Sequence, residues 1–333
     1  MSSVVSVAIH ESQFPEAVTR DLLESLRRRE INHKFHYDSV KQTEKWLALH
    51  EAYSPARTDR ACQQAYDGAY EAVIRRLPEG LVELIGLGCG GGQKDVRLLQ
   101  LIRARGLSAR YWPVDVSAAM VMTARRAAAE LAPEVVSHPF VCDLLTADVL
   151  AAAFDRPAPE PAVRLITFFG MMPNFEPQNI LPKLAALVRP RDYLLLSANL
   201  APGEDYAAGV RQILPLYDNA LTREWLLTLL YDLGVESGDG GLRFEVEQPP
   251  AADGLWRVTA RFHFQQPRRI RVMNEAFEFR PGESIRLFFS YRHTPALMRE
   301  LLKPHGLEAL EHWTPPSGEE GVFLCRRVAD GAR

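Results

Sequence analysis

Two aspartates follow a cluster of glycines in this sequence, each at the end of a short apolar run. The cluster spans residues 86–92, Asp115 ends the next strand-like run, and Asp143 ends the run after that. A carboxylate at the end of the second strand of such a unit can accept hydrogen bonds from ribose hydroxyls. The carboxylate of Asp143 can accept one from the amine of an adenine, while its apolar neighbour Leu144 packs on the ring. These residue types in this order indicate a site for a nucleoside cofactor.

The glycine cluster suits the close approach of a ligand to the backbone. Gly88 and Gly90 can adopt positive φ and leave open the space that a Cβ would fill. The apolar run 81–85 enters the cluster and a helical pattern starts after Gly92, so free N–H groups of the first helical turn face the same place. A strand, a glycine turn and a helix begin the nucleotide site of a doubly wound sheet. A tight turn without a ligand would also contain glycines, so the two aspartates decide the interpretation.

The identity of the cofactor depends on whether a second mononucleotide-binding half follows the first strands. A ribose-binding acid is shared by enzymes that use nicotinamide dinucleotides and by enzymes that use S-adenosylmethionine (SAM). Two acids at successive strand ends, without a second mononucleotide half, favour SAM. A nicotinamide-dependent oxidoreductase would need that second half where the sequence predicts a different kind of segment.

The alternation of strands and helices predicts an α/β fold whose sheet positions these residues. The pattern runs from Leu81 to about Leu200, with the fourth and fifth strands expected at 163–170 and 192–200. Ligands of open α/β sheets bind beyond the carboxyl ends of the strands. Asn174 follows the fourth strand and is therefore a candidate for contact with the substrate.

A different pattern follows the fifth strand. Two helices precede runs of alternating apolar and polar residues at 241–247, 256–264 and 269–279. Such alternation is typical of an antiparallel sheet with one wet face, so we interpret this segment as an α+β insertion. A strand at 284–291 and a helix at 294–305, followed by a closing strand, are expected to return to the main sheet.

These patterns divide the chain into four parts. We expect an N-terminal helical cover at 1–58, a core at 59–200, the insertion at 201–285 and the end of the core at 286–333. The N-terminal part is polar with scattered aromatic residues, and we expect it to face the substrate.

The composition restricts the function classes. The 333 residues carry a formal net charge of −3, so nothing argues for a nucleic-acid partner. The four cysteines lack metal-ligand spacing, so we expect free thiols, no metal and a reducing compartment. The sequence has no stretch near the roughly 20 apolar residues of a membrane span and no secretory pattern at its start, which predicts a cytoplasmic protein without a membrane partner. The oligomeric state cannot be read from the sequence.

Several short motifs, taken in order, resemble one family of enzymes. The chain is similar to the histidine-specific, SAM-dependent N-methyltransferases of ergothioneine biosynthesis over roughly residues 30–328, as a divergent member. The motifs that carry the resemblance are Phe35-His36-Tyr37-Asp38, Tyr53-Ser54-Pro55-Ala56-Arg57, the glycine cluster with Lys94, Pro113-Val114-Asp115-Val116-Ser117, Phe169 to Pro177, Tyr217-Asp218-Asn219, Gly282-Glu283-Ser284 and His312-Trp313-Thr314-Pro315.

The resemblance implies a class I methyltransferase, with a Rossmann-like sheet and a substrate-binding insertion, that uses SAM and a free amino acid. It implies that the cofactor contacts Gly88, Lys94, Asp115 and Asp143, with Tyr37 close to the same pocket. It also implies that Tyr53, Asn174 and Tyr217 hold the carboxylate and amino group of the amino acid, and that Ser290 matches a serine that helps to recognise the imidazole of histidine.

The chain departs from the family pattern at informative positions. Where the family has a glutamate that contacts the imidazole of histidine, this chain has Phe288. The first acid of the glycine motif is replaced by Gly86, and the glycine before Asn174 by Pro173. The departure at Phe288 predicts that the acceptor is an amino acid other than histidine, with an apolar or modified side chain. Two alternatives remain. The chain is a true histidine N-methyltransferase in which Phe288 merely packs in the interior, or it is a binding or regulatory protein that lost the reaction.

The expected chemistry needs few catalytic groups. Methyl transfer from a sulfonium requires correct positioning and a free lone pair on the acceptor nitrogen. The neutral side chains of Tyr53, Asn174 and Tyr217 can orient an uncharged amine, and they are our candidates for catalysis. We expect the histidines to serve in packing or at the surface rather than in catalysis, in particular His33, His36, His50 and His293.

Overall fold

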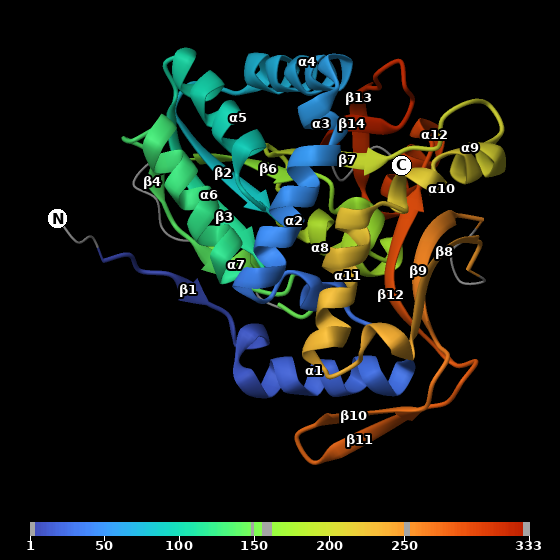
Figure 1. Ribbon diagram of the computed structural model, residues 1–333. Coiled ribbons are helices and arrows are strands. Elements are labelled where there is room, and N and C mark those ends of the chain that lie inside the picture. The colour runs from blue at the N-terminus through green and yellow to red at the C-terminus, as the bar shows by residue number, and fades with distance from the viewer. Residues whose placement is uncertain (1–3, 148–149, 155–161, 250–253, 329–333) are drawn as a thin grey trace.

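The computed structural model describes residues 4–147, 150–154, 162–249 and 254–328. Figure 1 shows a large sheet flanked by helices and, beside it, a smaller sheet with a projecting hairpin. The α2 helix passes in front of the large sheet, between it and the smaller one, in that view. No described helix is both long and apolar enough to span a bilayer.

The large sheet has the strand order β1-β5-β3-β2-β6-β7-β14-β13, with β4 paired to β3. The pairs from β1 to β7 are parallel, and β14 runs antiparallel to both β7 and β13. This doubly wound, mixed sheet confirms the predicted α/β class. Its strands are β1 (Ala8–Ile9), β2 (Leu81–Leu87), β3 (Ser108–Asp115), β4 (Val136–Ser137), β5 (Phe140–Val141), β6 (Ala162–Phe168), β7 (Tyr193–Asn199), β13 (Leu307–Trp313) and β14 (Glu320–Arg327).

The central strand β2 is apolar on both faces because helices cover the sheet on both sides. Leu84 points into a core formed with α4, α5 and α6, whereas its neighbour Ile85 points into a core formed with α8 and α12. A strand buried on two faces is a continuous apolar run rather than an alternating one. The helices of the chain are α1 (Pro15–Arg28), α2 (Val40–Tyr53), α3 (Pro55–Thr58), α4 (Arg60–Arg76), α5 (Gln93–Ala104), α6 (Ala118–Leu131), α7 (Leu150–Phe154), α8 (Pro177–Leu187), α9 (Tyr206–Gln212), α10 (Leu214–Tyr217), α11 (Ala220–Asp232) and α12 (Pro295–Leu302).

The second sheet is antiparallel, in the order β12-β9-β8, from β12 (Ser284–Arg292), β9 (Trp256–Phe264) and β8 (Gly240–Glu247). One face packs on α11 and on the N-terminal segment through a shared apolar core that includes Phe35, Trp225 and Phe262. The expected insertion sheet and helical cover are thus present and joined to each other.

One expectation about this sheet was wrong. The strand at 284–291, which we assigned to the main sheet, is β12 and pairs with β9 in the second sheet. The expected boundary between residues 285 and 286 therefore lies inside a strand of the insertion. Because β12 is buried along almost its whole length, its sequence resembles that of a core strand.

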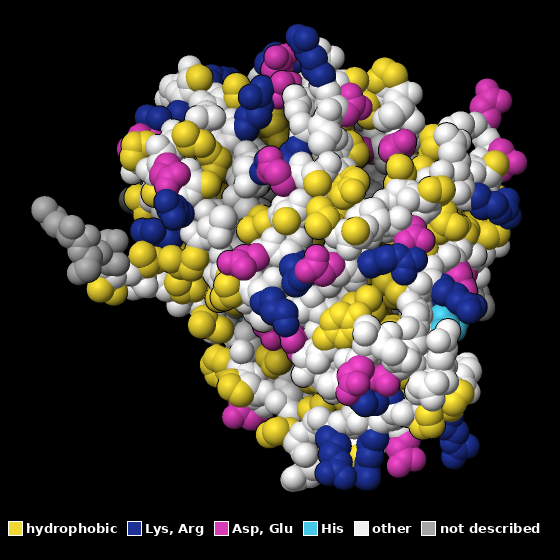
Figure 2. All heavy atoms as spheres, viewed as in Figure 1, with side chains coloured by type: hydrophobic (Ala, Val, Ile, Leu, Met, Phe, Trp, Pro, Cys, Tyr) yellow, Lys and Arg dark blue, Asp and Glu magenta, His cyan; other side chains and the backbone are white. Residues whose placement is uncertain are grey.

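Two further details differ from the expectation. The strand expected at 269–279 is a hairpin of β10 (Arg268–Val272) and β11 (Glu275–Phe279), which turns at Met273 with φ of 52°. The N-terminal part, expected outside the sheet, contributes the edge strand β1. On the face shown in Figure 2, basic and acidic side chains are interspersed. The ion pairs Lys41–Asp232 and Lys45–Glu224 link α2 to α11.

Candidate cofactor and acceptor site

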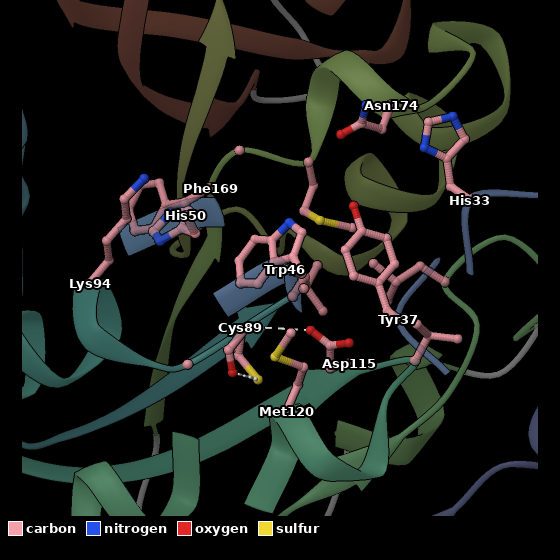
Figure 3. A pocket seen from close by; sticks show the side chains of 18 of the residues that line it. His33, Tyr37, Trp46, His50, Cys89, Lys94, Asp115, Met120, Phe169 and Asn174 are labelled. Atoms are coloured by element: carbon pink, nitrogen blue, oxygen red, sulfur yellow. Dashed lines mark hydrogen bonds between the residues drawn. The ribbon is translucent and has the colours of Figure 1, made fainter. Parts of the chain in front are cut away.

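A cavity of about 330 Å³ lies at the carboxyl ends of the parallel strands. Its walls come from the glycine turn after β2, the ends of β3, β5 and β6, the α2 helix, and the short 3₁₀ helices η2 (His33–His36) and η3 (Met172–Asn174). Figure 3 shows Asp115, Cys89 and Met120 at one end and Asn174 with His33 at the other, with Trp46 and Tyr37 between them.

The glycine turn forms the floor of this cavity with left-handed backbone. Gly88 has φ of 65° and Gly90 has φ of 52°, values that side chains with a Cβ rarely adopt. A Cβ on Gly88 would lie 2.5 Å from the Met171 side chain, and one on Gly90 would lie 3.1 Å from Trp46. Both glycines are therefore required by the turn and by close packing around it.

Asp115 ends β3 inside the cavity, where its carboxylate also fixes the glycine turn. Its Oδ2 accepts a hydrogen bond from the Gly90 N–H at 3.0 Å, and its Oδ1 accepts one from the Ser117 N–H at 3.0 Å. Burial raises the pKa of Asp115 to about 6, although these backbone N–H groups oppose the shift. Each carboxylate oxygen has a second lone pair, which suits the two hydroxyls of a ribose.

Asp143 lies next along the cavity, just beyond β5. Its Oδ1 accepts the Leu145 N–H at 2.9 Å, whereas its buried Oδ2 has no hydrogen-bond partner among the described residues. Lys34 Nζ lies 3.5 Å from that oxygen and forms an ion pair with it, and Lys34 Nζ donates its hydrogen bond to Asp21. An acceptor left open beside the apolar Leu144 fits the amine and ring of an adenine, so the residues present fit SAM.

Lys94 lies in the first turn of α5 and lines another side of the cavity. Its Nζ donates to the Tyr66 hydroxyl at 2.6 Å and lies 3.8 Å from Glu320 Oε1, while Tyr66 donates to the same carboxylate. Glu320, from β14, lines the cavity and was missed by the sequence reasoning, since the resemblance covered its strand without assigning it a role.

The replaced acid of the glycine motif has a local substitute. A Cβ at Gly86 would lie 2.0 Å from Asp95 Oδ2, so the Asp95 carboxylate occupies the space that a side chain at this position would take. Asp95 accepts hydrogen bonds from the Tyr111 hydroxyl at 2.8 Å and from Thr167 Oγ1 at 2.7 Å, and burial raises its pKa to about 6. The cavity wall thus still contains a carboxylate, which comes from α5 instead of β2.

The predicted acceptor residues fall into two groups. Tyr53 and Asn174 line the cavity, and Tyr53 remains 53% exposed at its rim. Tyr217 and Ser290 lie outside the lining, where the Tyr217 hydroxyl and Ser290 Oγ are 2.8 Å apart. Of the three residues expected to form one clamp, Tyr53 and Asn174 thus line the cavity and Tyr217 does not.

Asn199 connects the two groups. It lines the cavity from the end of β7 and donates from Nδ2 to Ser290 Oγ at 3.3 Å. Arg292 donates to the Tyr217 hydroxyl at 2.8 Å and completes this network. Asn199 was not predicted, although a polar residue at the carboxyl end of a parallel strand was the available signal.

Phe288 does not line the cavity. It belongs to the apolar core under the second sheet, with ring centroids 5.8 Å from Trp225 and 6.2 Å from Tyr217. His33, which does line the cavity, packs on Phe288 with ring centroids 5.1 Å apart. Phe288 thus lies behind His33 and outside the cavity lining.

The histidines also separate into two groups. His36 and His293 are fully buried away from the cavity, and burial lowers the pKa of each to about 4. His50 stacks on Trp46 at 4.8 Å and lines the cavity together with His33. The expectation that these residues pack describes the first pair fully and the second pair only in part.

A doubly wound sheet, a glycine turn and cavity-lining carboxylates at the ends of β3 and β5 are the features of a class I methyltransferase with a nucleoside cofactor site. The sequence pattern of the family described as histidine-specific, SAM-dependent methyltransferases matches residues 18–327, and the chain belongs to this family. The recognition of family, fold and cofactor from the sequence is confirmed.

Two relatives share the name histidine N-alpha-methyltransferase. The chain is 25% identical to the histidine N-alpha-methyltransferase of Mycobacterium tuberculosis (strain CDC 1551 / Oshkosh), covering 97% of this chain and 99% of the relative. It is also 25% identical to that of Mycolicibacterium smegmatis (strain ATCC 700084 / mc(2)155), covering 94% and 95%. Among solved structures, magnesium protoporphyrin IX methyltransferase from Synechocystis PCC 6803 matches with a TM-score of 0.47 and 14% identity, over 89% of this chain and 97% of that one.

Proposed function

We propose that this protein transfers a methyl group from SAM to the amino nitrogen of a free amino acid or a close derivative. The observation that carries the proposal is the single cavity whose lining includes both Asp115 and Asn174. A cofactor held by the first residue and an amino acid held by the second would meet inside the same cavity. Bringing reactants together in this way is the main requirement of an in-line displacement.

The cofactor end is formed by acids at the ends of β3 and β5, which are neighbours in the sheet. Asp115 would hold the ribose hydroxyls and Asp143 the adenine amine, with Leu144 against the ring. When bound, SAM supplies an electrophilic methyl group on a sulfonium centre. The floor of glycines keeps the backbone close, and Met120 and Trp46 add apolar walls.

At the acceptor end, the orientation of Asn174 is fixed by its own hydrogen bond. Its Nδ2 donates to the Phe289 carbonyl at 2.8 Å, which leaves its amide oxygen free to accept from the amine of an amino acid. Figure 3 shows the Tyr37 hydroxyl pointing toward Asn174. Burial and the nearby Asp115 raise the pKa of Tyr37, so this phenol stays neutral and can orient an uncharged amine without a fixed charge. The proton lost by the acceptor ammonium leaves to solvent before attack.

Screening free amino acids with SAM by mass spectrometry tests the proposal. We expect one amino acid, or a small set, to gain the mass of one or more methyl groups, and the product to form far more slowly with Asn174→Ala. Binding of SAM without methylation of any amino acid would instead favour a binding or regulatory protein. The substitutions at Gly86 and Pro173 are the sequence support for that alternative, and the Asp95 carboxylate beside Gly86 weakens it.

Histidine itself is the second candidate for the acceptor. It is favoured by the names of both curated relatives and by the place of Phe288 outside the cavity lining, which removes the argument for an apolar acceptor based on that residue. Competition among histidine, tryptophan, tyrosine, phenylalanine, leucine and methionine decides between them. A preference for histidine that is undiminished in Phe288→Ala would assign histidine as the acceptor.

A further inference from the structure

His33 occupies the place in the cavity where the acceptor side chain would meet the second sheet. It begins η2, and its ring packs on Phe288 at 5.1 Å and edge-on against Phe289 at 4.6 Å between centroids. In Figure 3 its ring lies beside Asn174, at the opposite end of the cavity from Asp115. The two aromatic residues hold the ring in one orientation.

A backbone hydrogen bond fixes which ring nitrogen carries the proton. The Phe289 N–H donates to His33 Nε2 at 3.3 Å, and a ring nitrogen that accepts a hydrogen bond carries no proton. In the neutral ring the proton must then sit on Nδ1. Burial, together with His36, Arg286 and Arg257, holds the pKa of His33 well below its usual range, so the ring is neutral.

The Nδ1–H of His33 is a donor without a partner. This atom is buried and makes no hydrogen bond with the described residues, while the residue itself lines the cavity. An unpaired buried donor is unfavourable, and donors of this kind in native structures usually meet a ligand or an ordered water. Because His33 lies beside Asn174, a bound amino acid is the expected hydrogen-bond acceptor for its Nδ1–H.

We propose that His33 is the specificity-determining residue of the acceptor end, and that its Nδ1–H donates a hydrogen bond to the side chain of the acceptor amino acid. The proposal rests on the proposed function and names its substrate class: amino acids whose side chain presents a lone pair, such as a ring nitrogen, a carbonyl or a phenol or ether oxygen.

The tautomer can be tested without any substrate. In ¹⁵N-labelled protein, the two ring nitrogens of a neutral histidine have well-separated chemical shifts for the protonated and the unprotonated atom. We expect the His33 signals, assigned by their loss in His33→Phe, to belong to the Nδ1–H tautomer. The Nε2–H tautomer at this residue would overturn the proposal.

Kinetics with matched ring analogues test the contact itself. Phenylalanine and the three pyridylalanines have the same shape, but only the pyridylalanines carry a ring nitrogen that accepts a hydrogen bond. We expect at least one of them to bind on the order of tenfold more tightly than phenylalanine in competition with the acceptor, and this preference to vanish in His33→Phe. His33→Asn, which keeps an N–H donor near the same place, should restore part of it.

The controls separate this proposal from the proposed function. His312→Phe removes a histidine that lies on β13 outside the cavity lining and should leave every constant unchanged. An unaltered affinity for SAM shows that His33→Phe is folded. If an amino acid is methylated but its side chain has no lone pair, or if His33→Phe keeps the preference, His33 has only a packing role. If no amino acid is methylated, the proposed function and this assignment fail together.

Discussion

At the scale of single residues, Asp115 both holds the glycine turn in place and lines the cofactor cavity. Its carboxylate ties β3 to the glycine turn through Gly90 and Ser117, and the same two oxygens face the cavity. Replacement by alanine should therefore weaken SAM binding by roughly 2–4 kcal/mol, since charge-assisted hydrogen bonds to the ribose are lost. Isothermal titration calorimetry measures this directly. Asp67→Ala, which removes an exposed acid paired with Arg97, is the control, and equal affinities of parent and Asp115→Ala would refute the assignment.

The pH dependence of cofactor binding follows from the same residue. Burial raises the pKa of Asp115 to about 6. An acid is ionised above its pKa, so the carboxylate accepts hydrogen bonds at pH 7 and is largely protonated at pH 5. We expect the affinity for SAM to fall about tenfold between these two values. The pKa of Asp95 is also about 6, so the profile should persist in Asp95→Asn and disappear in Asp115→Ala. A profile that flattens only in Asp95→Asn would assign the titration to the other acid.

The acceptor side of the cavity depends on Asn174. Its amide is held by the Phe289 carbonyl, and loss of its free oxygen should cost about 1–3 kcal/mol of binding in the transition state. We predict that Asn174→Ala lowers kcat/KM for the acceptor and leaves the Kd for SAM nearly unchanged. Asn179→Ala, on the exposed face of α8, should change neither constant. Equal losses in both constants would indicate a scaffold role for Asn174.

At the scale of elements, the α2 helix forms much of the cover over the cavity. It carries Trp46, His50 and, at its last residue, Tyr53. Its start is fixed by a capping box between Ser39 and Gln42, an arrangement that satisfies helix N–H groups which lack intrahelical partners.

Removal of this cap should loosen the cover. We predict that Ser39→Ala destabilises the protein by about 1 kcal/mol, measured by urea unfolding, and raises KM for both substrates because the cavity wall moves with the helix. Ser108→Ala, at an exposed position of β3, is the control and should alter neither quantity. A stability loss without any change in KM would separate the helix start from the cavity.

Some elements were predictable because their signals are local. The run 81–87 and the glycine turn are read within one strand–turn–helix unit, and the acids at 115 and 143 are each read at the end of a short apolar run; all lie where the sequence indicated them. The partner of β12 was not predictable, because burial on both faces is common to core strands and to strands between two layers. The role that we propose for His33 was also not predictable, since it depends on the Phe289 N–H, which lies far away in the sequence.

At the scale of the whole molecule, the cavity has walls from the parallel sheet, the N-terminal segment and the loops that face the second sheet. The division into a core and a substrate part remains a proposal. If both parts contribute to the site, saturating SAM should stabilise them together, by about 2.7 kcal/mol at one hundred times its Kd. We expect a single thermal transition that shifts upward by several degrees, observed by calorimetry. Two transitions, of which only one moves, would show that the N-terminal and second-sheet parts are not coupled to the cofactor.

The contact of Glu320 with Tyr66 and Lys94 has a consequence for the order in which the site forms during protein synthesis. β14 is inserted between β7 and β13, and it is translated after every other strand of the described chain. When the ribosome has synthesised the chain through the second sheet, the glycine turn, Asp115 and Asn174 are already present. Lys94 still lacks its acidic neighbour Glu320, and the side of the cavity that β14 forms is open. The cavity wall that contains Lys94 should therefore be complete only after β14 has joined the sheet.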